Sequence, residues 1–303
     1  MKIYYTDHFE LPLPDGHRFP MVKYRQLRQH IVRSDYHRQD SLLVPPAATD
    51  EQLLTCHTER YVSAVCDGTL NTHEIRRIGF PWSPKMVERS RRSTGATLAA
   101  SRAALTDGIA VNLAGGTHHA MRDAGEGYCI FNDAAVTIRT LQREKLIQRA
   151  CVIDLDVHQG NGTAEILGDD QTAFTLSLHG VKNFPIRKSP SDLDVNLDDG
   201  TTDEQYMTAL HKALHQLENS QPFDLAIFLA GADPYEHDRL GRLKVSKKGL
   251  AERDRTVMQW CLSRNIPLAI AMAGGYAPDV KDIVSIHGMT VQLASMHCRS
   301  KKQ

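Results

Sequence analysis

Five short, almost continuously apolar runs constrain the fold of this 303-residue chain more than any other feature. A strand that is apolar on both faces is typical of the centre of a parallel sheet, because helices cover each face and exclude water. The chain is therefore expected to belong to the α/β class. The five runs are residues 109–113, 151–155, 173–178, 225–230 and 267–271.

Amphipathic segments lie between these runs. Ser83 and Pro84 provide an N-cap and a first-turn proline for a helix that is expected to end near Gly108. Because strands and helices alternate without a linker or an internal repeat, residues 1–303 are expected to form one domain. Its core would be a single doubly wound, mostly parallel sheet with helices on both faces. Three further helices are predicted at 203–218, 246–264 and 279–296.

The charge balance and the cysteines narrow the possible classes of protein. Thirty-six Lys and Arg residues balance thirty-six Asp and Glu residues, so a sequence-independent grip on nucleic acid is not expected. No apolar stretch approaches the roughly 20 residues of a membrane-spanning helix, and the first residues do not resemble a secretory signal. The six cysteines form no Cys-x-x-Cys pair, which favours free thiols in a reducing compartment. We expect a cytoplasmic enzyme or binding protein, whose oligomeric state the sequence leaves open.

Chemically reactive residues follow four of the five apolar runs. In open parallel sheets, ligands bind beyond the carboxyl ends of the strands, so these residues are expected to share one site. They are His118 and His119 after the first run, Asp156 and His158 after the second, Asp233 after the fourth and Tyr276 after the fifth.

Asp156 and His158 have the spacing of two ligands to one metal ion. Alternate residues of an extended segment point the same way, so a carboxylate and an imidazole can meet at one point. With Asp233 as a third ligand, such a site keeps positions open for water and substrate, and a metal there lowers the pKa of bound water toward about 7. The alternative is that Asp156 caps a turn and that His158 packs in the core.

The adjacent histidines are candidates for acid–base catalysis. One of them could act as general base and the other as proton donor, if an acceptor orients the far ring nitrogen of each. Asp154 and Asn161 flank the metal pair and are the natural acceptors. The alternative is a histidine pair that only stabilises a loop.

Tyr276 follows two glycines, which let the backbone approach closely, and its phenol could donate a hydrogen bond to a developing oxyanion. A purely structural tyrosine is the alternative here. The glycine pairs match neither a dinucleotide-binding fingerprint nor a P-loop, and no Gly-x-Ser-x-Gly elbow occurs. Two short basic runs, at 76–77 and 89–92, are interpreted as a solvated helix face.

Five ordered motifs make the chain similar to the zinc-dependent histone deacetylase family, within the arginase/deacetylase superfamily, over essentially its full length. The stretches at 158–162 and 238–241 most resemble the class IV branch and its bacterial relatives. The five motifs are Gly-Thr-His-His-Ala at 116–120, Gly-Tyr-Cys-Ile-Phe-Asn-Asp at 127–133, Asp-Leu-Asp-Val-His-Gln-Gly-Asn-Gly-Thr at 154–163, Gly-Ala-Asp at 231–233 and Gly-Gly-Tyr at 274–276.

The resemblance implies the arginase/deacetylase fold and assigns roles to these residues. It implies Zn2+ on Asp156, His158 and Asp233, with Fe2+ as an alternative in the cell. It implies His118 and His119 as the acid–base pair, oriented by Asp154 and Asn161, and Tyr276 as the residue that polarises the carbonyl. A structural K+ is implied at Asp154, Asp156, His158, Ser177 and Leu178. The implied acyl-lysine tunnel consists of Gly127, Tyr128, Phe184, Leu240, Gly274 and Gly275.

The activity implied by the resemblance is hydrolysis of N-ε-acyl-lysine, acetyl or longer, in peptides or proteins by metal-activated water. Leu240 stands where relatives that prefer acetylpolyamines carry Glu, which lowers but does not exclude a polyamine substrate. The zero net charge fits a neutral amide that enters an uncharged tunnel without a basic docking surface.

Two alternatives to this activity remain open: an acetylpolyamine or other small-amide hydrolase, and a catalytically weak protein that binds acyl-lysine or small acids. A binuclear ureohydrolase is disfavoured because Pro234, and not a second ligand pair, follows Asp233.

Overall fold

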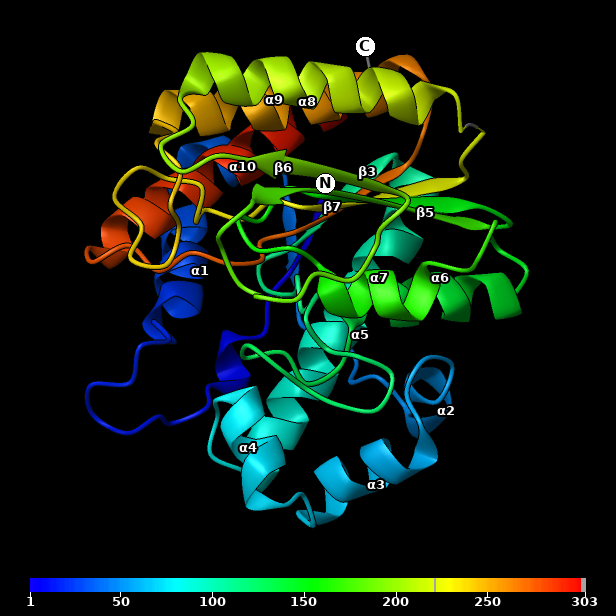
Figure 1. Ribbon diagram of the computed structural model, residues 1–303. Helices are drawn as coiled ribbons and strands as arrows, with labels where there is room; N and C mark the ends of the chain where they lie inside the picture. Colours follow the sequence, from blue (N-terminus) through cyan, green and yellow to red (C-terminus); the bar gives the residue numbers. More distant parts are fainter. Residues whose placement is uncertain (221, 301–303) are drawn as a thin grey trace.

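An eight-stranded sheet runs through the middle of the computed structural model, which describes residues 1–220 and 222–300 (Figure 1). The strands lie in the order β2-β1-β3-β8-β7-β4-β5-β6, and each neighbouring pair is parallel. The predicted α/β class and doubly wound parallel sheet are therefore confirmed. The strands are β1 Lys2–Tyr4, β2 Ser41–Leu43, β3 Ile109–Asn112, β4 Ala150–Asp154, β5 Ala173–Gly180, β6 Leu193–Leu197, β7 Leu225–Leu229 and β8 Leu268–Ala271.

The five apolar runs form the five consecutive strands β3, β8, β7, β4 and β5. The three strands that the sequence reading missed lie at the two sides of the sheet. Strands β1 and β2 have three residues each, and β6 is half-buried with the polar Asp194 and Asn196 in it. Strands near a sheet edge bury less surface, so their sequences lack the continuous apolar pattern that made the central strands predictable.

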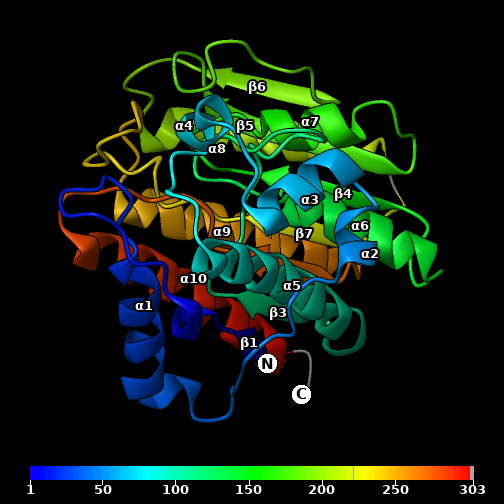
Figure 2. The same ribbon diagram turned by 90° about the horizontal axis from the view of Figure 1, so that it is seen from below.

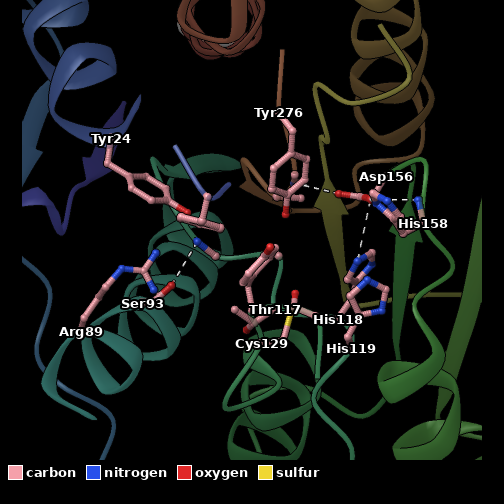
Figure 3. A pocket seen from close by; sticks show the side chains of 17 residues that line it. Tyr24, Arg89, Ser93, Thr117, His118, His119, Cys129, Asp156, His158 and Tyr276 are labelled. Carbon is pink, nitrogen blue, oxygen red and sulfur yellow. Dashed lines mark hydrogen bonds and ion pairs between the residues drawn. The ribbon is translucent and has the colours of Figure 1, made fainter. Parts of the chain in front are cut away.

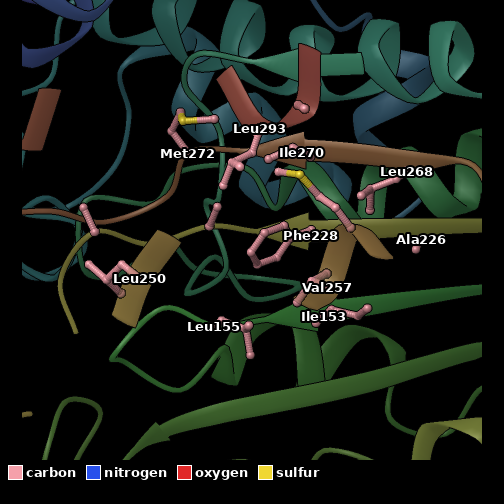
Figure 4. Packing of buried hydrophobic residues seen from close by; sticks show 14 of the residues in the cluster. Ile153, Leu155, Ala226, Phe228, Leu250, Val257, Leu268, Ile270, Met272 and Leu293 are labelled. Carbon is pink, nitrogen blue, oxygen red and sulfur yellow. The ribbon is translucent and has the colours of Figure 1, made fainter. Parts of the chain in front are cut away.

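Alternate side chains of each strand enter two separate hydrophobic cores, one on each face of the sheet. Ile153 and Phe228 belong to the core that α1, α8, α9 and α10 cover, and Figure 4 shows them packed beside Val257 of α9. Val152 and Ile227 point to the opposite core, which α2 to α7 cover. Full burial of a side chain of this size stabilises a fold by about 2 kcal/mol.

The predicted helices are present, and the residues at their starts act as caps. The Ser83 side chain accepts a hydrogen bond from the Met86 backbone at the start of α5, and Ser246 caps α9 in the same way. The helices are α1 Val22–Arg33, α2 Asp50–Leu53, α3 Glu59–Asp67, α4 Thr72–Ile78, α5 Pro84–Asp107, α6 Asp133–Arg143, α7 Asn161–Leu167, α8 Asp203–Glu218, α9 Lys247–Ser263 and α10 Val280–Ser300. Among the described residues, none of these helices combines the length and apolarity that crossing a membrane requires.

The topology brings the four reactive strand ends together. Strands β3, β8, β7 and β4 are neighbours in the sheet although their order along the chain is different. Figure 2 shows the face on which α3, α5 and α6 lie in front of these strands. Because all four strands are parallel, the loops that follow them leave the sheet at the same edge.

Candidate active site

Asp156, His158 and Asp233 form a buried group in which one ligand atom from each residue lies within 4.8 Å of the others. The Nδ1 atom of His158 lies 2.9 Å from Oδ1 of Asp156 and 3.3 Å from Oδ2 of Asp233. Strand β4 ends at Asp154, so Asp156 and His158 lie in a bend beyond the strand and not in an extended segment. Their side chains meet nevertheless, because the bend turns both of them toward Asp233.

Backbone amides hold the two carboxylates in place. Asp156 Oδ2 accepts a hydrogen bond from the Gly274 amide at 2.8 Å, and Asp233 Oδ1 accepts one from the Val157 amide at 2.9 Å. A side chain at Gly274 would collide with them, because its Cβ would lie 1.9 Å from Asp233 Oδ2. Glycine is therefore the residue that allows this close approach.

These residues fit a divalent cation. Asp233 Oδ2 is buried, and its polar contact among the described residues is with Nδ1 of His158 at 3.3 Å, without the geometry of a hydrogen bond. Burial, together with the charge of Asp156, raises the pKa of Asp233 to about 7. Two buried carboxylates beside an imidazole are a stable arrangement when a metal ion supplies the compensating positive charge.

His118 lies next to this group and contacts a carboxylate through each ring nitrogen. Its Nδ1 donates to Asp154 Oδ2 at 2.6 Å, and its Nε2 lies 3.9 Å from Asp156 Oδ1. Burial alone would lower the pKa of His118, but the charges of Asp154 and Asp156 outweigh it and raise the pKa to about 9. A cation on Asp156 would offset part of that charge and lower the pKa of His118 again.

His119 has a neutral partner instead. Its Nδ1 lies 2.6 Å from Oδ1 of Asn161, and the Asn161 amide nitrogen donates to Glu126 Oε2 at 3.2 Å. Burial and the nearby rings of His118 and His158 lower the pKa of His119 well below its ordinary value. The two adjacent histidines therefore occupy electrostatically different positions.

Tyr276 contributes its phenol from the loop after β8 (Figure 3). Asp238 holds this loop by accepting the Tyr276 amide at 2.6 Å, and the buried Lys23 donates to the carbonyl oxygens of Ala273 and Gly275. Burial and the charges of the two aspartates nearby raise the pKa of Tyr276. The hydroxyl therefore stays protonated at neutral pH and can act as a donor.

A small inner cavity of about 40 Å³ lies between these residues, with Gly274 in its wall. Figure 3 shows Arg89 and Ser93 at the end that lies away from the histidines. Arg89 is only 6% exposed, and its guanidinium lies 5.2 Å from the Tyr24 ring centre and 5.6 Å from that of Phe19. The interpretation of 89–92 as a solvated helix face is therefore wrong for Arg89.

A wider outer cavity of about 500 Å³ leads to the same centre. Gly127, Tyr128, Phe184 and Leu240 line it, and their role in a substrate tunnel stays a prediction. Gly275 lines neither cavity; its carbonyl oxygen faces Lys23 instead. The expectation of an entrance without a basic surface is wrong, because the outer cavity also has arginine and lysine side chains in its wall.

The residues of the predicted monovalent-cation site lie behind the metal group. Asp154 of β4 and Ser177 of β5 are register partners, and the next residue, Leu178, is fully buried. The Ser177 hydroxyl lies 2.9 Å from Nδ1 of His179. The positions of these residues do not test K+ binding, so the K+ site stays a prediction.

Two residues that support the histidine loop were missed by the sequence reading. Asp133 accepts hydrogen bonds from the Gly116 and Thr117 amides at 2.9 and 2.8 Å. His57 is buried and binds both the Met121 carbonyl and the Asn132 amide. Asp133 stood within a recognised motif, whereas nothing near His57 in the sequence indicates its role, because its partners are more than 60 positions away.

The chain is similar to known proteins along most of its length. An uncharacterised protein of Picosynechococcus sp. is 41% identical over 95% of both chains, and Histone deacetylase 2 of Arabidopsis thaliana is 30% identical over 86% of this chain and 70% of its own length.

Solved structures share the fold. A histone deacetylase homologue from Aquifex aeolicus superposes with a TM-score of 0.79 at 23% identity, covering 100% of this chain and 84% of that one. A homologue in complex with SAHA gives a TM-score of 0.78 at 24% identity with the same coverage. Residues 17–289 match the model of the histone deacetylase domain, and the chain therefore belongs to the histone deacetylase family.

Proposed function

We propose that this chain is a zinc-dependent deacylase that removes acyl groups from N-ε-acyl-lysine in peptides or proteins. Membership of the histone deacetylase family makes it a deacetylase-type amidohydrolase, and that family is generally metal-dependent. The finer assignment rests on one observation: Asp156, His158 and Asp233 form a buried three-ligand group, and two of its members, Asp156 and His158, line the same cavity as His118, His119 and Tyr276.

Asp156, His158 and Asp233 would hold Zn2+, with Fe2+ as the alternative that the same donor set accepts. A bound metal would supply a Lewis acid for the acyl carbonyl and lower the pKa of a water molecule. Two observations support this use of the three residues: Asp233 Oδ2 is buried without a hydrogen bond of good geometry, and the absence of a side chain at Gly274 lets the two carboxylates lie close to each other.

The other polar residues would move protons and stabilise charge. His118, held by Asp154, would take the proton from the attacking water. The lowered pKa of His119, which Asn161 holds, leaves its Nε2 without a proton at rest, so this nitrogen would first take up a proton and then pass it to the departing lysine amine. Tyr276 would donate its hydroxyl hydrogen to the developing oxyanion, because burial keeps the phenol protonated. The products are a free lysine side chain and a carboxylate.

The outer cavity supports a lysine side chain as the group that enters. Tyr128 and Phe184 offer aromatic walls for its methylene stem, and Leu240 leaves that part of the wall uncharged. We propose that residues 1–303 act as one catalytic domain and that a K+ near Asp154 and Ser177 stabilises it. The complex of a structural relative with SAHA supports ligand binding in this fold.

The test is hydrolysis of a series of acyl-lysine peptides, from acetyl to myristoyl, by protein loaded with Zn2+ or Fe2+ and by protein freed of metal with a chelator. We expect hydrolysis that depends on the metal and returns when it is added back. Stoichiometric metal binding without hydrolysis of any peptide would contradict the proposed function and favour a binding protein.

A further inference from the structure

Cationic side chains from four separate parts of the chain line the outer cavity, and Glu126 is the carboxylate among its lining residues. The chain as a whole has no net charge, so the positive charge at this entrance is a local feature of the structure. The cations are Arg18 before α1, Arg76 and Arg77 at the end of α4, Lys182 after β5 and Arg242 before α9.

Nearby carboxylates neutralise only part of this charge. Glu126 lies 3.3 Å from Arg77, and Asp199 is shared between Lys182 at 3.6 Å and Arg242 at 3.0 Å. The entrance therefore keeps an excess of positive charge even where ion pairs form.

Arg18 and Arg76 supply the clearest part of that excess. Both are exposed, and within residues 1–220 and 222–300 neither has a carboxylate partner at ion-pair distance. Both line the cavity that leads to His119, His158 and Tyr276. Like charges gathered around a cleft focus the field and attract an oppositely charged ligand.

The cations lie beside two different walls of the entrance. One wall contains Gly127 and Tyr128, and the end of α4 lies beside it because the Gly127 amide donates to the Arg77 carbonyl at 3.1 Å. Lys182 precedes Asn183, whose side chain donates to the Leu240 carbonyl of another wall at 2.7 Å. A ligand that crosses the entrance would thus meet positive charge on both sides of the point where a lysine side chain enters.

From this geometry we propose that the preferred substrate is an acyl-lysine within an acidic peptide segment, with Asp or Glu residues on both sides of it. This inference rests on the proposed deacylase function and specifies its substrate class. On one side of the acyl-lysine, carboxylates of the segment pair with Arg76 at the end of α4 and with Arg18, whose neighbour His17 contacts the Gly79 carbonyl just past that helix. On the other side they approach Lys182 and Arg242, which share only Asp199. A segment rich in Lys or Arg, or the distal ammonium of a polyamine, meets like charge. The placement of cations on two walls favours an extended peptide over a single small anion.

Three peptides of equal length with a central acetyl-lysine test the proposal. Their flanking residues are Asp and Glu, Ser and Gly, or Lys and Arg, and free N-ε-acetyl-lysine is a fourth substrate. We expect kcat/KM of the zinc-loaded full chain to fall from acidic to neutral to basic flanks. The acidic and basic peptides should differ by about tenfold or more at low ionic strength, and the difference should shrink as salt screens the charges.

Charge reversal identifies the residues that cause the preference. The double variant Arg18→Glu/Arg76→Glu should lose the preference for acidic flanks or reverse it. The matched control Arg33→Glu/Lys212→Glu changes two exposed cations on α1 and α8 that do not line the entrance, and it should keep the wild-type order of the peptides.

The possible outcomes separate this inference from the proposed function. Equal kcat/KM for the three peptides, a preference for basic flanks, or a better rate with free N-ε-acetyl-lysine would overturn the acidic-peptide inference and leave a deacylase. Hydrolysis of none of them would overturn the deacylase function. Fluorescence anisotropy with labelled copies of the same peptides would then still decide the charge preference, since it measures binding without turnover.

Discussion

The ring nitrogen Nδ1 of His119 lies 2.6 Å from the side-chain oxygen of Asn161. Glu126 determines which way this amide points, because its carboxylate accepts a hydrogen bond and so must face the amide nitrogen of Asn161. The amide oxygen therefore faces His119, whose Nδ1 must carry the hydrogen and whose Nε2 is left for chemistry in the cavity. At the corresponding Nδ1 atom of His118 the partner is the carboxylate of Asp154, which is charged where Asn161 is neutral.

Replacement of Asn161 by Asp should change the pH dependence of turnover. A carboxylate stabilises the imidazolium form, so the pKa of His119 should rise. If His119 donates its proton to the leaving amine, its protonated form persists to higher pH in this variant. The alkaline limb of the plot of kcat/KM against pH should then shift to higher pH. Asn161→Ser, which keeps a neutral acceptor, is the control. A profile unchanged by Asn161→Asp would remove His119 from the donor role.

Tyr276→Phe should lower kcat by roughly 100- to 1000-fold, the usual effect of losing one oxyanion donor. The metal content should stay close to that of the wild type, because Tyr276 is not one of the three ligand residues. Steady-state kinetics together with metal analysis checks both expectations. If kcat remains at the wild-type value, the phenol has no part in the reaction.

Asp233→Ala should remove metal and activity together. The substitution deletes one of the three ligand side chains and leaves the Val157 amide without its acceptor. Asp35→Ala is a suitable control, because Asp35 forms an exposed ion pair with Arg38 far along the chain from the site. Metal content, circular dichroism and hydrolysis are the measurements. A folded Asp233→Ala protein with full metal content and activity would exclude Asp233 as a ligand.

Gly274→Ala should weaken metal binding although it adds a single methyl group. The new Cβ would lie 1.9 Å from Asp233 Oδ2 and 2.5 Å from Asp156 Oδ2, so the carboxylates have to move apart. Gly200→Ala is a matched glycine control without atoms near its Cβ, although its φ of +78° gives it some backbone strain. Titration with Zn2+ should show a loss of affinity of tenfold or more, comparable with loss of a ligand-orienting contact. Wild-type affinity in Gly274→Ala would mean that the two carboxylates do not share one ion.

Acyl groups longer than a few carbons should be poor substrates. The inner cavity of about 40 Å³ has room for only a few water molecules, and the Arg89 guanidinium and the Ser93 hydroxyl lie at its far end. A long alkyl chain would have to desolvate that cation without replacing its hydration. In a series from acetyl to myristoyl, kcat/KM should fall with chain length, and Arg89→Leu should reduce the fall. A higher rate for myristoyl than for acetyl would show that the acyl chain does not enter this cavity.

Sequence reasoning was most successful where one local pattern carries the information. Strand β4 at the centre of the sheet and helix α5 with its Ser83 cap were predicted because burial on both faces and a capped helix start each leave a pattern in neighbouring residues. Strand β6 was not predicted, since its half-buried, polar sequence differs little from a loop.

The same contrast holds for the candidate site. The amino-acid order shows which residue types follow which strands, and parallel strands leave those residues at one edge, so His118, Asp156 and Asp233 could be grouped in advance. It could not predict that Arg89 is buried or that Arg18, Arg76 and Arg242 meet at one entrance. The positions of these arginines depend on contacts between segments far apart in the chain. Burial and the sign of a local electrostatic field are sums over all such neighbours, so both depend on how the whole chain folds.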